Sequence, residues 1–148
     1  MASPALKKQL TTKKYNQQFI AGKVETWSDT DGISYVRYLP ETSIGYDDMV
    51  QIYVNGAGGS AVKDRKLVVL SDMRYVAHIS PEALDFSVSG TVLERVGAMA
   101  VVADHLEARN LSHHYICEFK PPLPIRVFSN IEAARLWLLS LLHDGTIE

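Results

Sequence analysis

Residues 104–142 read DHLEARNLSHHYICEFKPPLPIRVFSNIEAARLWLLSLL and carry the clearest signals of the fold. Its first part, Asp104–Phe119, predicts a helix, which the prolines of Lys120–Pro124 end, because proline lacks the N–H that a helix interior needs. A short β-rich run, Ile125–Phe128, and a second amphipathic segment, Asn130–Leu142, follow. Helix, strand and helix in this order are typical of the closing unit of a small alternating α/β domain.

The last of these segments carries the signals that start and stop a helix. Ser129 precedes Glu132 by three residues, the spacing of a capping box, and Gly145 follows the end. We expect the apolar stripe of this helix to face the core. The stripe consists of Ile131, Ala134, Trp137, Leu138, Leu141 and Leu142. Leu136 and Leu139 lie outside the stripe, and this wide apolar surface predicts a homodimer.

The first half of the chain begins with two strand-like runs, Phe19–Trp27 and Ile33–Leu39. The connection between them ends in Asp-Gly, a strong hairpin signal. Neither face of the second run is cleanly polar, which suits a sheet that is covered on both sides. Asp47–Asn55 has the residues of either a strand or a helix. We favour a helix, because a crossover must precede the next parallel strand.

Two continuous apolar runs, Lys66–Ser71 and Ala98–Ala103, predict central strands that are buried on both faces. Between them, Ser80-Pro81-Glu82 opens a helix with a serine cap, a proline in the first turn and an acid at the positive end of the helix dipole. Strands and helices therefore alternate, and the sequence predicts an α/β fold.

The composition is that of an ordinary globular protein, with 47% hydrophobic and 22% charged residues. A chain of 148 residues predicts a single domain with a core of its own. Cys117 is the single cysteine, which excludes an intramolecular disulfide and fits a reducing, cytoplasmic location. No apolar run approaches the ~20 residues that a membrane helix needs, and no signal peptide is expected.

The charge is uneven along the chain. Lys7, Lys8, Lys13 and Lys14 lie before residue 15, and no acid precedes Glu25. These residues predict a basic, partly disordered leader over residues 1–18. Residues 19–148 are expected to form the one domain. Without these four lysines, eleven basic residues face seventeen acidic ones, a net charge of −6. An acidic body argues against nucleic acid as a partner.

Three patterns that could carry chemistry have simpler explanations. Gly56–Ala61 matches the glycine fingerprint of dinucleotide sites, but only four residues separate it from the next strand, which leaves no helix to receive a pyrophosphate. His113 and His114 are adjacent in the predicted helix and point about 100° apart, so they do not share one metal ion. Cys117 occupies an apolar helix, a position typical of the core. We therefore predict no cofactor, no metal, no catalytic residue and no enzyme activity.

The best candidate for a binding site follows the buried run that ends at Ser71. Asp72 and Arg74 come directly after this run, and His78 and Ser80 follow closely. The carboxyl ends of parallel strands are where open α/β sheets usually bind ligands and partners. Free backbone N–H groups at the helix start near Ser80 add a place for an anion. We expect these four residues to line one surface that binds a partner or a ligand.

The loop between Arg74 and His78 is expected to be anchored by three apolar residues, namely Tyr75, Val76 and Ile79. Arg74 and His78 then remain free to face a partner. The alternative is that Asp72 hydrogen-bonds its own loop while Arg74 is solvated.

Several of these segments together resemble the bacterial STAS-like domain proteins, also described as anti-sigma-factor-antagonist-like or STAS/CRAL-TRIO-like. The resemblance covers about Phe19 to Leu142. It rests on Leu67–Arg74, Ile79–Glu82, Ala100–Asp104, Phe119–Phe128 and Glu132–Leu138. It implies a mostly parallel βαβ sheet with helices packed against it, in a non-enzymatic regulatory or protein–protein interaction module.

The resemblance also implies a switch that this chain does not match. The antagonists bind a partner kinase through the loop and helix after the central strand, where a serine that follows an aspartate is phosphorylated. Here the aspartate position falls on Ser80 and the serine position on Pro81, which cannot accept a phosphate. Lipid-binding relatives of similar topology imply the alternative function, the binding of a small apolar or anionic ligand. A closed apolar cavity favours that alternative, whereas an exposed apolar patch beside a solid core favours a protein partner.

Overall fold

The computed structural model describes residues 13–56, 66–106, 108–110, 112–113 and 123–145. In chain order its elements are β1 (Tyr15–Ile20), β2 (Val24–Ser28), β3 (Ile33–Tyr38), β4 (Ser43–Ile44), α2 (Tyr46–Gln51), the π-helix η1 (Ile52–Gly56), β5 (Leu67–Asp72), β6 (His78–Ile79), α3 (Pro81–Ser87), α4 (Gly90–Leu93), β7 (Val96–Val102), β8 (Ile125–Phe128) and α6 (Ile131–His143). Within the predicted helix Asp104–Phe119, the described residues 106, 108–110, 112 and 113 are helical, and residues 114–119 lie outside the description.

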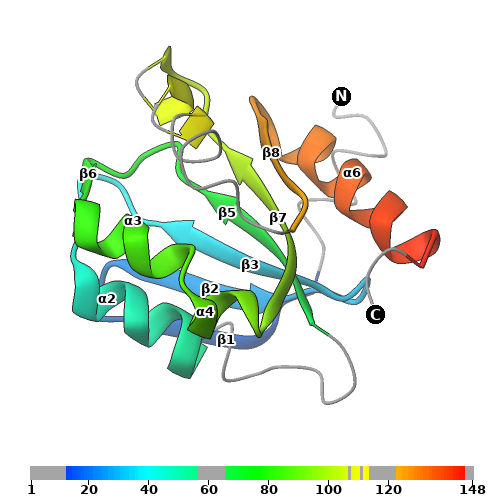
Figure 1. The fold of residues 1–148 in the computed structure, drawn as a ribbon, viewed down its shortest axis with the longest axis horizontal. Coiled ribbons are helices and arrows are strands. Elements are labelled where there is room, and N and C mark those ends of the chain that lie inside the picture. The colour runs from blue at the N-terminus through cyan, green and yellow to red at the C-terminus, as the bar shows by residue number, and fades with distance from the viewer. Residues whose placement is uncertain (1–12, 57–65, 107, 111, 114–122, 146–148) are drawn as a thin grey trace.

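Six strands form one sheet in the order β1-β2-β3-β5-β7-β8 (Figure 1). β1, β2 and β3 pair antiparallel, and β3, β5, β7 and β8 pair parallel. Every residue of β5 is buried, and so are all but one of β7, because apolar side chains that alternate between two covered faces are shielded on both. The predicted α/β fold with a mostly parallel sheet is confirmed.

Helices cover the two faces of the sheet unequally (Figure 1). We call the side covered by α2, α3 and α4 the α2/α3 face, and the side covered by α6 the α6 face. The core of the α2/α3 face includes Val36, Tyr38, Met49, Ile52, Tyr53, Met73, Val69, Met99 and Val101. The core of the α6 face consists of Ile33, Tyr35, Val68, Leu70, Ala98, Ala100, Val102, Ala134 and Leu138. Consecutive residues of one strand therefore contribute to opposite cores.

The predicted hairpin forms between β2 and β3, but the first expected run is not one strand. A tight turn at residues 21–23 divides Phe19–Trp27, with positive φ angles at Ala21 (53°) and Gly22 (68°). Glycine favours that conformation and alanine tolerates it at a cost, so the turn is set by its neighbours as well as by its own residues. The leader boundary expected at residue 18 also falls inside β1, which begins at Tyr15.

β1 is one of the two edge strands of the sheet, and it is irregular. Its pairing with β2 shifts register between Tyr15 and Gln18, where Asn16 has a φ angle of 55°. Phe19, on the same strand, is 63% exposed. Such a bulge bends an edge strand and interrupts its ladder of hydrogen bonds.

The ambiguous segment Asp47–Asn55 is helical, as favoured above, and forms α2 and η1. Asp48 lies in the first turn of α2, and its carboxylate accepts a hydrogen bond from the backbone N–H of the N-cap residue Gly45 at 2.9 Å. That bond is the main cause that lowers the pKa of Asp48. Met49, Ile52 and Tyr53 are almost fully buried, because helical spacing turns all three toward the sheet.

The last helix forms where expected, with a different cap. Asn130, not Ser129, is the N-cap residue, and its side-chain oxygen accepts a hydrogen bond from the N–H of Ala133 at 2.8 Å. The prediction of a Ser129–Glu132 capping box was therefore wrong by one residue. Ala134 and Leu138 are fully buried, whereas Trp137 is half-buried against Phe128.

Candidate functional site

The two residues at the carboxyl end of β5 form a buried ion pair. The Asp72 carboxylate is 5% exposed, and the Arg74 guanidinium donates to both of its oxygens, from Nε to Oδ1 and from Nη2 to Oδ2, each at 2.9 Å. Asp72 also accepts a hydrogen bond from the backbone N–H of Arg74 at 3.2 Å. This pairing raises the pKa of Arg74, and burial opposes the rise. Arg74 is therefore the counter-ion of Asp72 and not an unpaired charge, and its place in a partner-binding surface stays a prediction.

Backbone hydrogen bonds hold the loop that follows this pair. Four of them, between 2.9 and 3.2 Å long, join residues 75–80 to residues 41–44. Two of these residues on each side also form the short parallel sheet of β4 and β6. The loop is therefore fixed by its main chain, independently of the side chains that it presents to solvent.

The side chains that anchor this loop differ in part from those expected. Ile79 is 6% exposed and Val76 packs against the same core, as predicted. Tyr75 does not anchor the loop, because half of its surface is exposed; Met73, 8% exposed, takes that place. The Arg74 guanidinium lies over the Tyr75 ring, 5.1 Å from its centroid. An arginine and a tyrosine thus lie together at the surface, beside the end of the central strand.

The other two predicted site residues lie on the same loop and have separate roles. His78 is exposed on β6. The Ser80 hydroxyl accepts a hydrogen bond from the N–H of Ala83 at 3.1 Å and caps α3, as its sequence context predicts. In the part of the chain that the structure describes, no hydrogen bond joins the Asp72–Arg74 pair to His78 or Ser80.

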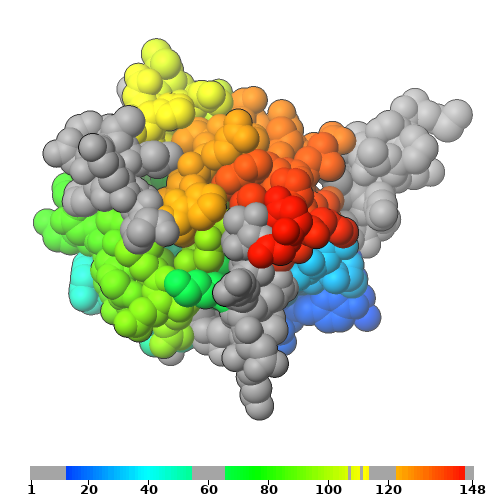
Figure 2. Space-filling model, turned by 45° about the vertical axis from the view of Figure 1, so that its right-hand side comes forward, coloured from blue at the N-terminus to red at the C-terminus, as the bar shows by residue number. Residues whose placement is uncertain are grey.

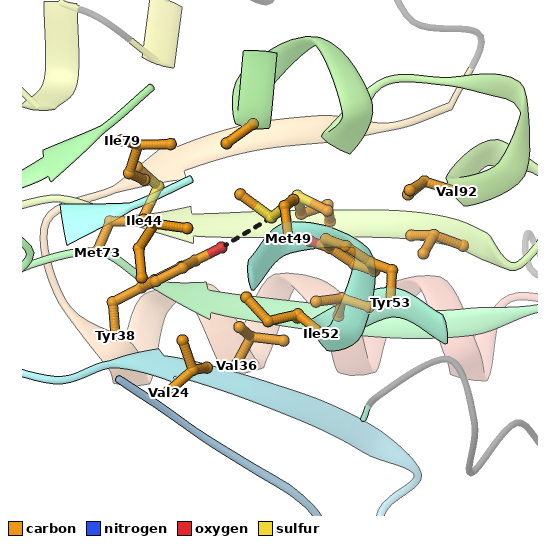
Figure 3. Close-up of a cluster of buried hydrophobic side chains, with 14 of the residues drawn as sticks. Val24, Val36, Tyr38, Ile44, Met49, Ile52, Tyr53, Met73, Ile79 and Val92 are labelled. Atoms are coloured by element: carbon orange, nitrogen blue, oxygen red, sulfur yellow. Dashed lines mark hydrogen bonds between the residues drawn. The ribbon is translucent and has the colours of Figure 1, made fainter. Parts of the chain in front are cut away.

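A cavity of about 70 Å³ lies within the α2/α3 face, between the sheet and helices α2 and α3. It is partly enclosed and mostly apolar, and none of the described residues that line it is charged. Met49, Met73 and Met99 all line it, and they are the only methionines of the sequence after Met1. Figure 3 shows Met49 and Met73 near Tyr38 and Tyr53 in this core.

Tyr38 brings a hydroxyl to this cavity (Figure 3). It is 2% exposed, and its O–H donates to the Met49 sulfur over 3.6 Å. A thioether sulfur is a weak acceptor, so this buried donor has a weak partner. Burial raises the pKa of Tyr38, and a side-chain hydrogen bond with Ser71 opposes the rise. The hydroxyl therefore stays protonated and able to donate.

A second polar cluster fastens α6 to the β2–β3 hairpin. The buried Asp29 carboxylate accepts from the Tyr35 hydroxyl at 2.7 Å and from the N–H groups of Asp31 and Ile33. Arg135 of α6 donates to the Tyr35 oxygen at 2.8 Å and to Asp31 at 2.9 Å. The space-filling view shows the orange and red C-terminal segment directly against the blue N-terminal strands (Figure 2). The polar groups of this cluster bind one another within the protein, and we infer that the cluster stabilises the fold.

A protein-family model matches most of the chain. A model described as a domain of unknown function, DUF7793, matches residues 26–142. The chain belongs to this family. No curated protein matches the chain.

One solved structure similar to this DUF7793 chain is an uncharacterized protein of the DUF3478 family from Shewanella loihica PV-4, which has a SpoIIAA-like fold. The TM-score is 0.57 and the sequence identity 13%, over 78% of this chain and 91% of that chain. At this identity the likeness concerns the fold alone. The DUF7793 chain therefore has the SpoIIAA-like, or STAS-like, fold that its sequence resembles.

Some of the features singled out in the sequence lie outside the residues that the structure describes. Residues 57–61 of the glycine-rich motif, His114 and Cys117 lie outside the described residues. Within the described ranges, no group of three histidine, cysteine or acidic side chains could hold a metal ion. None of the helices in those ranges is long and apolar enough to cross a membrane.

Sequence reasoning identified the end of β5 but overlooked the cavity. A signal for the cavity was present, because methionines are few in this chain and all three internal ones line it. The exposed position of Tyr75 had no such signal, since an aromatic residue in a short loop is as often an anchor as a contact.

Proposed function

We propose that this protein is a non-enzymatic regulatory module of the STAS-like class that binds a protein partner through the loop after β5. We call this surface the β5-loop surface and define it as Arg74, Tyr75 and His78. The observation that carries the proposal is Tyr75, which is half exposed on a loop that its backbone holds in place. A large aromatic residue on a preorganised loop gains contact area on binding with little loss of entropy.

The neighbours of Tyr75 support the same function. Arg74 lies over its ring while paired with Asp72, so the guanidinium is fixed before any partner arrives. Tyrosine and arginine are enriched among the residues that dominate protein interfaces. His78 adds an exposed polar group on the adjoining strand β6.

The test is capture of native partners by the immobilised protein, with quantitative mass spectrometry of what is retained. Tyr75→Ala should lose the specific partners by at least tenfold. The matched control is Tyr15→Ala, which removes another exposed tyrosine, on β1. Equal retention by the Tyr75 variant, or equal loss by both variants, would sink the proposal. Circular dichroism checks that each variant is folded.

Arg74→Glu is a poor test of the same surface, although charge reversal is the usual choice. It would place a second carboxylate beside Asp72 and leave the buried one without its counter-ion. Loss of binding would then follow from loss of structure. Tyr75 and His78 carry no such ion pair in the described structure, so their substitution separates binding from folding.

We propose further that the module works without the phosphoserine switch of the STAS-like antagonists. Pro81 cannot be phosphorylated, and the Ser80 hydroxyl is engaged as the cap of α3. Phosphopeptide mass spectrometry of the protein from its native cell should find Ser80 unmodified. Detection of phosphorylated Ser80 would restore the switch.

The homodimer through α6 stays a prediction, as does the cytoplasmic location. Leu136 is 62% exposed and supports the dimer, whereas Leu139 packs against the core of the α6 face and does not. Light scattering at high protein concentration tests the dimer, and Leu136→Glu should then shift the mass to that of a monomer.

A further inference from the structure

We propose that the cavity of the α2/α3 face is a binding site for a short, neutral aliphatic molecule that carries one oxygen acceptor, such as a ketone. This site is separate from the β5-loop surface and does not depend on the function proposed for it. Three observations lead to it: the residues that line the cavity, the hydrogen bond of Tyr38, and the absence of charge among the described lining residues.

The lining is built from the chain's most adaptable side chains. Met49, Met73 and Met99 come from α2, from the residue after β5, and from β7, and they meet at one cavity. Methionine is unbranched and polarizable, so a methionine-lined site repacks around ligands of different shape at low cost. A core selected for rigidity alone favours branched residues with well-defined rotamers, such as the valines of β5.

The Tyr38 hydroxyl supplies the polar contact that orients a ligand. It donates to the Met49 sulfur, a weak acceptor, at 3.6 Å. A carbonyl or hydroxyl oxygen in the cavity would accept this hydrogen bond more strongly and free the Met49 side chain to move. Ser71 and Ser87 also line the cavity, but the Ser87 hydroxyl donates to the Leu84 carbonyl at 2.6 Å.

The size and charge of the cavity narrow the class of ligand. A volume of 70 Å³ is about half that of an engineered 150 Å³ cavity that binds benzene, which has six heavy atoms, so the ligand has about three or four heavy atoms. None of the described lining residues could neutralise a carboxylate or an ammonium group, and burying such a charge unpaired is very costly. The ligand is therefore neutral.

The experiment uses the full chain labelled with ¹³C at the methionine methyl groups, with acetone as the probe and sodium acetate as its charged counterpart. We expect acetone to shift the methyl signals of Met49, Met73 and Met99 with half-saturation in the millimolar range, and to leave Met1 unchanged. Acetate should shift none of them. Absence of any shift with acetone, equal shifts with acetate, or a shift of Met1 equal to the other three would overturn the proposal.

Two variants test the assignment of the site. Ser87→Leu should fill the cavity and abolish the shifts. Ser140→Leu is the matched control, because Ser140 makes the same hydrogen bond to the carbonyl three residues earlier, Trp137, on an exposed part of α6. It should bind acetone as the unmodified protein does.

Tyr38→Phe provides a test that does not depend on the folding of the Ser87 variant. It keeps the ring and removes the hydroxyl, so it should weaken binding about three- to tenfold, the usual worth of one neutral hydrogen bond. Unchanged binding in Ser87→Leu or in Tyr38→Phe would contradict the site as proposed.

Discussion

The two faces of the sheet are built by different means, although they share the same strands. On the α6 face, small residues such as Ala98, Ala100 and Ala134 let the helix approach closely, and the Asp29–Tyr35–Arg135 cluster fixes its position. On the α2/α3 face, three methionines surround a cavity. One face of this domain therefore stabilises the fold by close packing, while the other face keeps a cavity lined by flexible side chains.

The largest expected effect lies on the tightly packed side. Leu138→Ala, at a fully buried position of α6, should lower the free energy of unfolding by about 2–5 kcal/mol, because it leaves a cavity that the sheet cannot fill. Leu136→Ala, on the exposed side of the same helix, is the control and should cost less than about 0.5 kcal/mol. Urea denaturation followed by circular dichroism measures both. Equal losses would mean that α6 faces the sheet with another side.

Next comes the ion pair at the end of β5. Arg74→Met should cost about 2–3 kcal/mol, somewhat less than for a fully buried pair, because the Arg74 side chain is 25% exposed. Adding Asp72→Asn should recover part of the loss, since no buried charge then lacks a partner. Denaturant melts of the two single variants and the double variant measure the coupling. Strictly additive losses would show that the two side chains do not stabilise each other.

Adjacent residues of β7 compare the two faces directly. Ala100 faces α6 and Val101 lines the cavity, so a larger side chain at each probes a different core. Ala100→Val should cost about 1–3 kcal/mol through overpacking, whereas Val101→Ile should cost less than about 1 kcal/mol. Thermal and urea melts of both variants measure the two losses in the free energy of unfolding. A larger loss at Val101 would reverse the comparison.

The smallest expected effect depends on pH and concerns Glu25, a buried residue of β2. Burial acts to raise its pKa, but hydrogen bonds and charges from Lys14, Gln17 and Arg37 prevail and lower it below the ordinary 4.5. A lowered pKa in the folded state means that Glu25 contributes its full stability above pH 4.5 and loses it as the pH falls through the folded pKa.

Urea melts from pH 7 to pH 3 should therefore show a difference between the unmodified protein and Glu25→Gln. It should be constant above about pH 5, shrink below the ordinary pKa, and stay under about 1 kcal/mol, because Lys14 and Arg37 are both well exposed. Glu94→Gln, at an exposed glutamate, is the control. A difference that grows on acidification would mean that the pKa of Glu25 is raised in the folded protein.

Much of the fold was predictable because its signals are local. The apolar run of β5, the serine cap of α3 and the strand β8 each follow from a few adjacent residues. The turn that separates β1 from β2 was missed, since only Gly22 of its two residues at positive φ gives a sequence signal, and Ala21 gives none. The cap of α6 was misplaced because Ser129 and Asn130 are both good caps and only the chain's path chooses between them.

The candidate site was less predictable, because its properties depend on contacts between distant segments. The sequence placed Asp72 and Arg74 at the end of a buried strand. It did not show that the two side chains are largely buried and form an ion pair with each other. Likewise, the methionines of the cavity are 24 and 26 residues apart, and only the crossover connections of a parallel sheet bring them together.

The bulge in β1 affects how readily the edge of the sheet can pair with a strand of another molecule. An edge strand offers unpaired N–H and C=O groups to any extended chain, and the exposed ring of Phe19 would add an apolar contact. With Asn16 in the left-handed region, the outer ladder is interrupted near the start of the strand, so a foreign strand cannot pair along its full length. The irregularity thus serves as a barrier to sheet-to-sheet aggregation, located at the antiparallel edge of the domain.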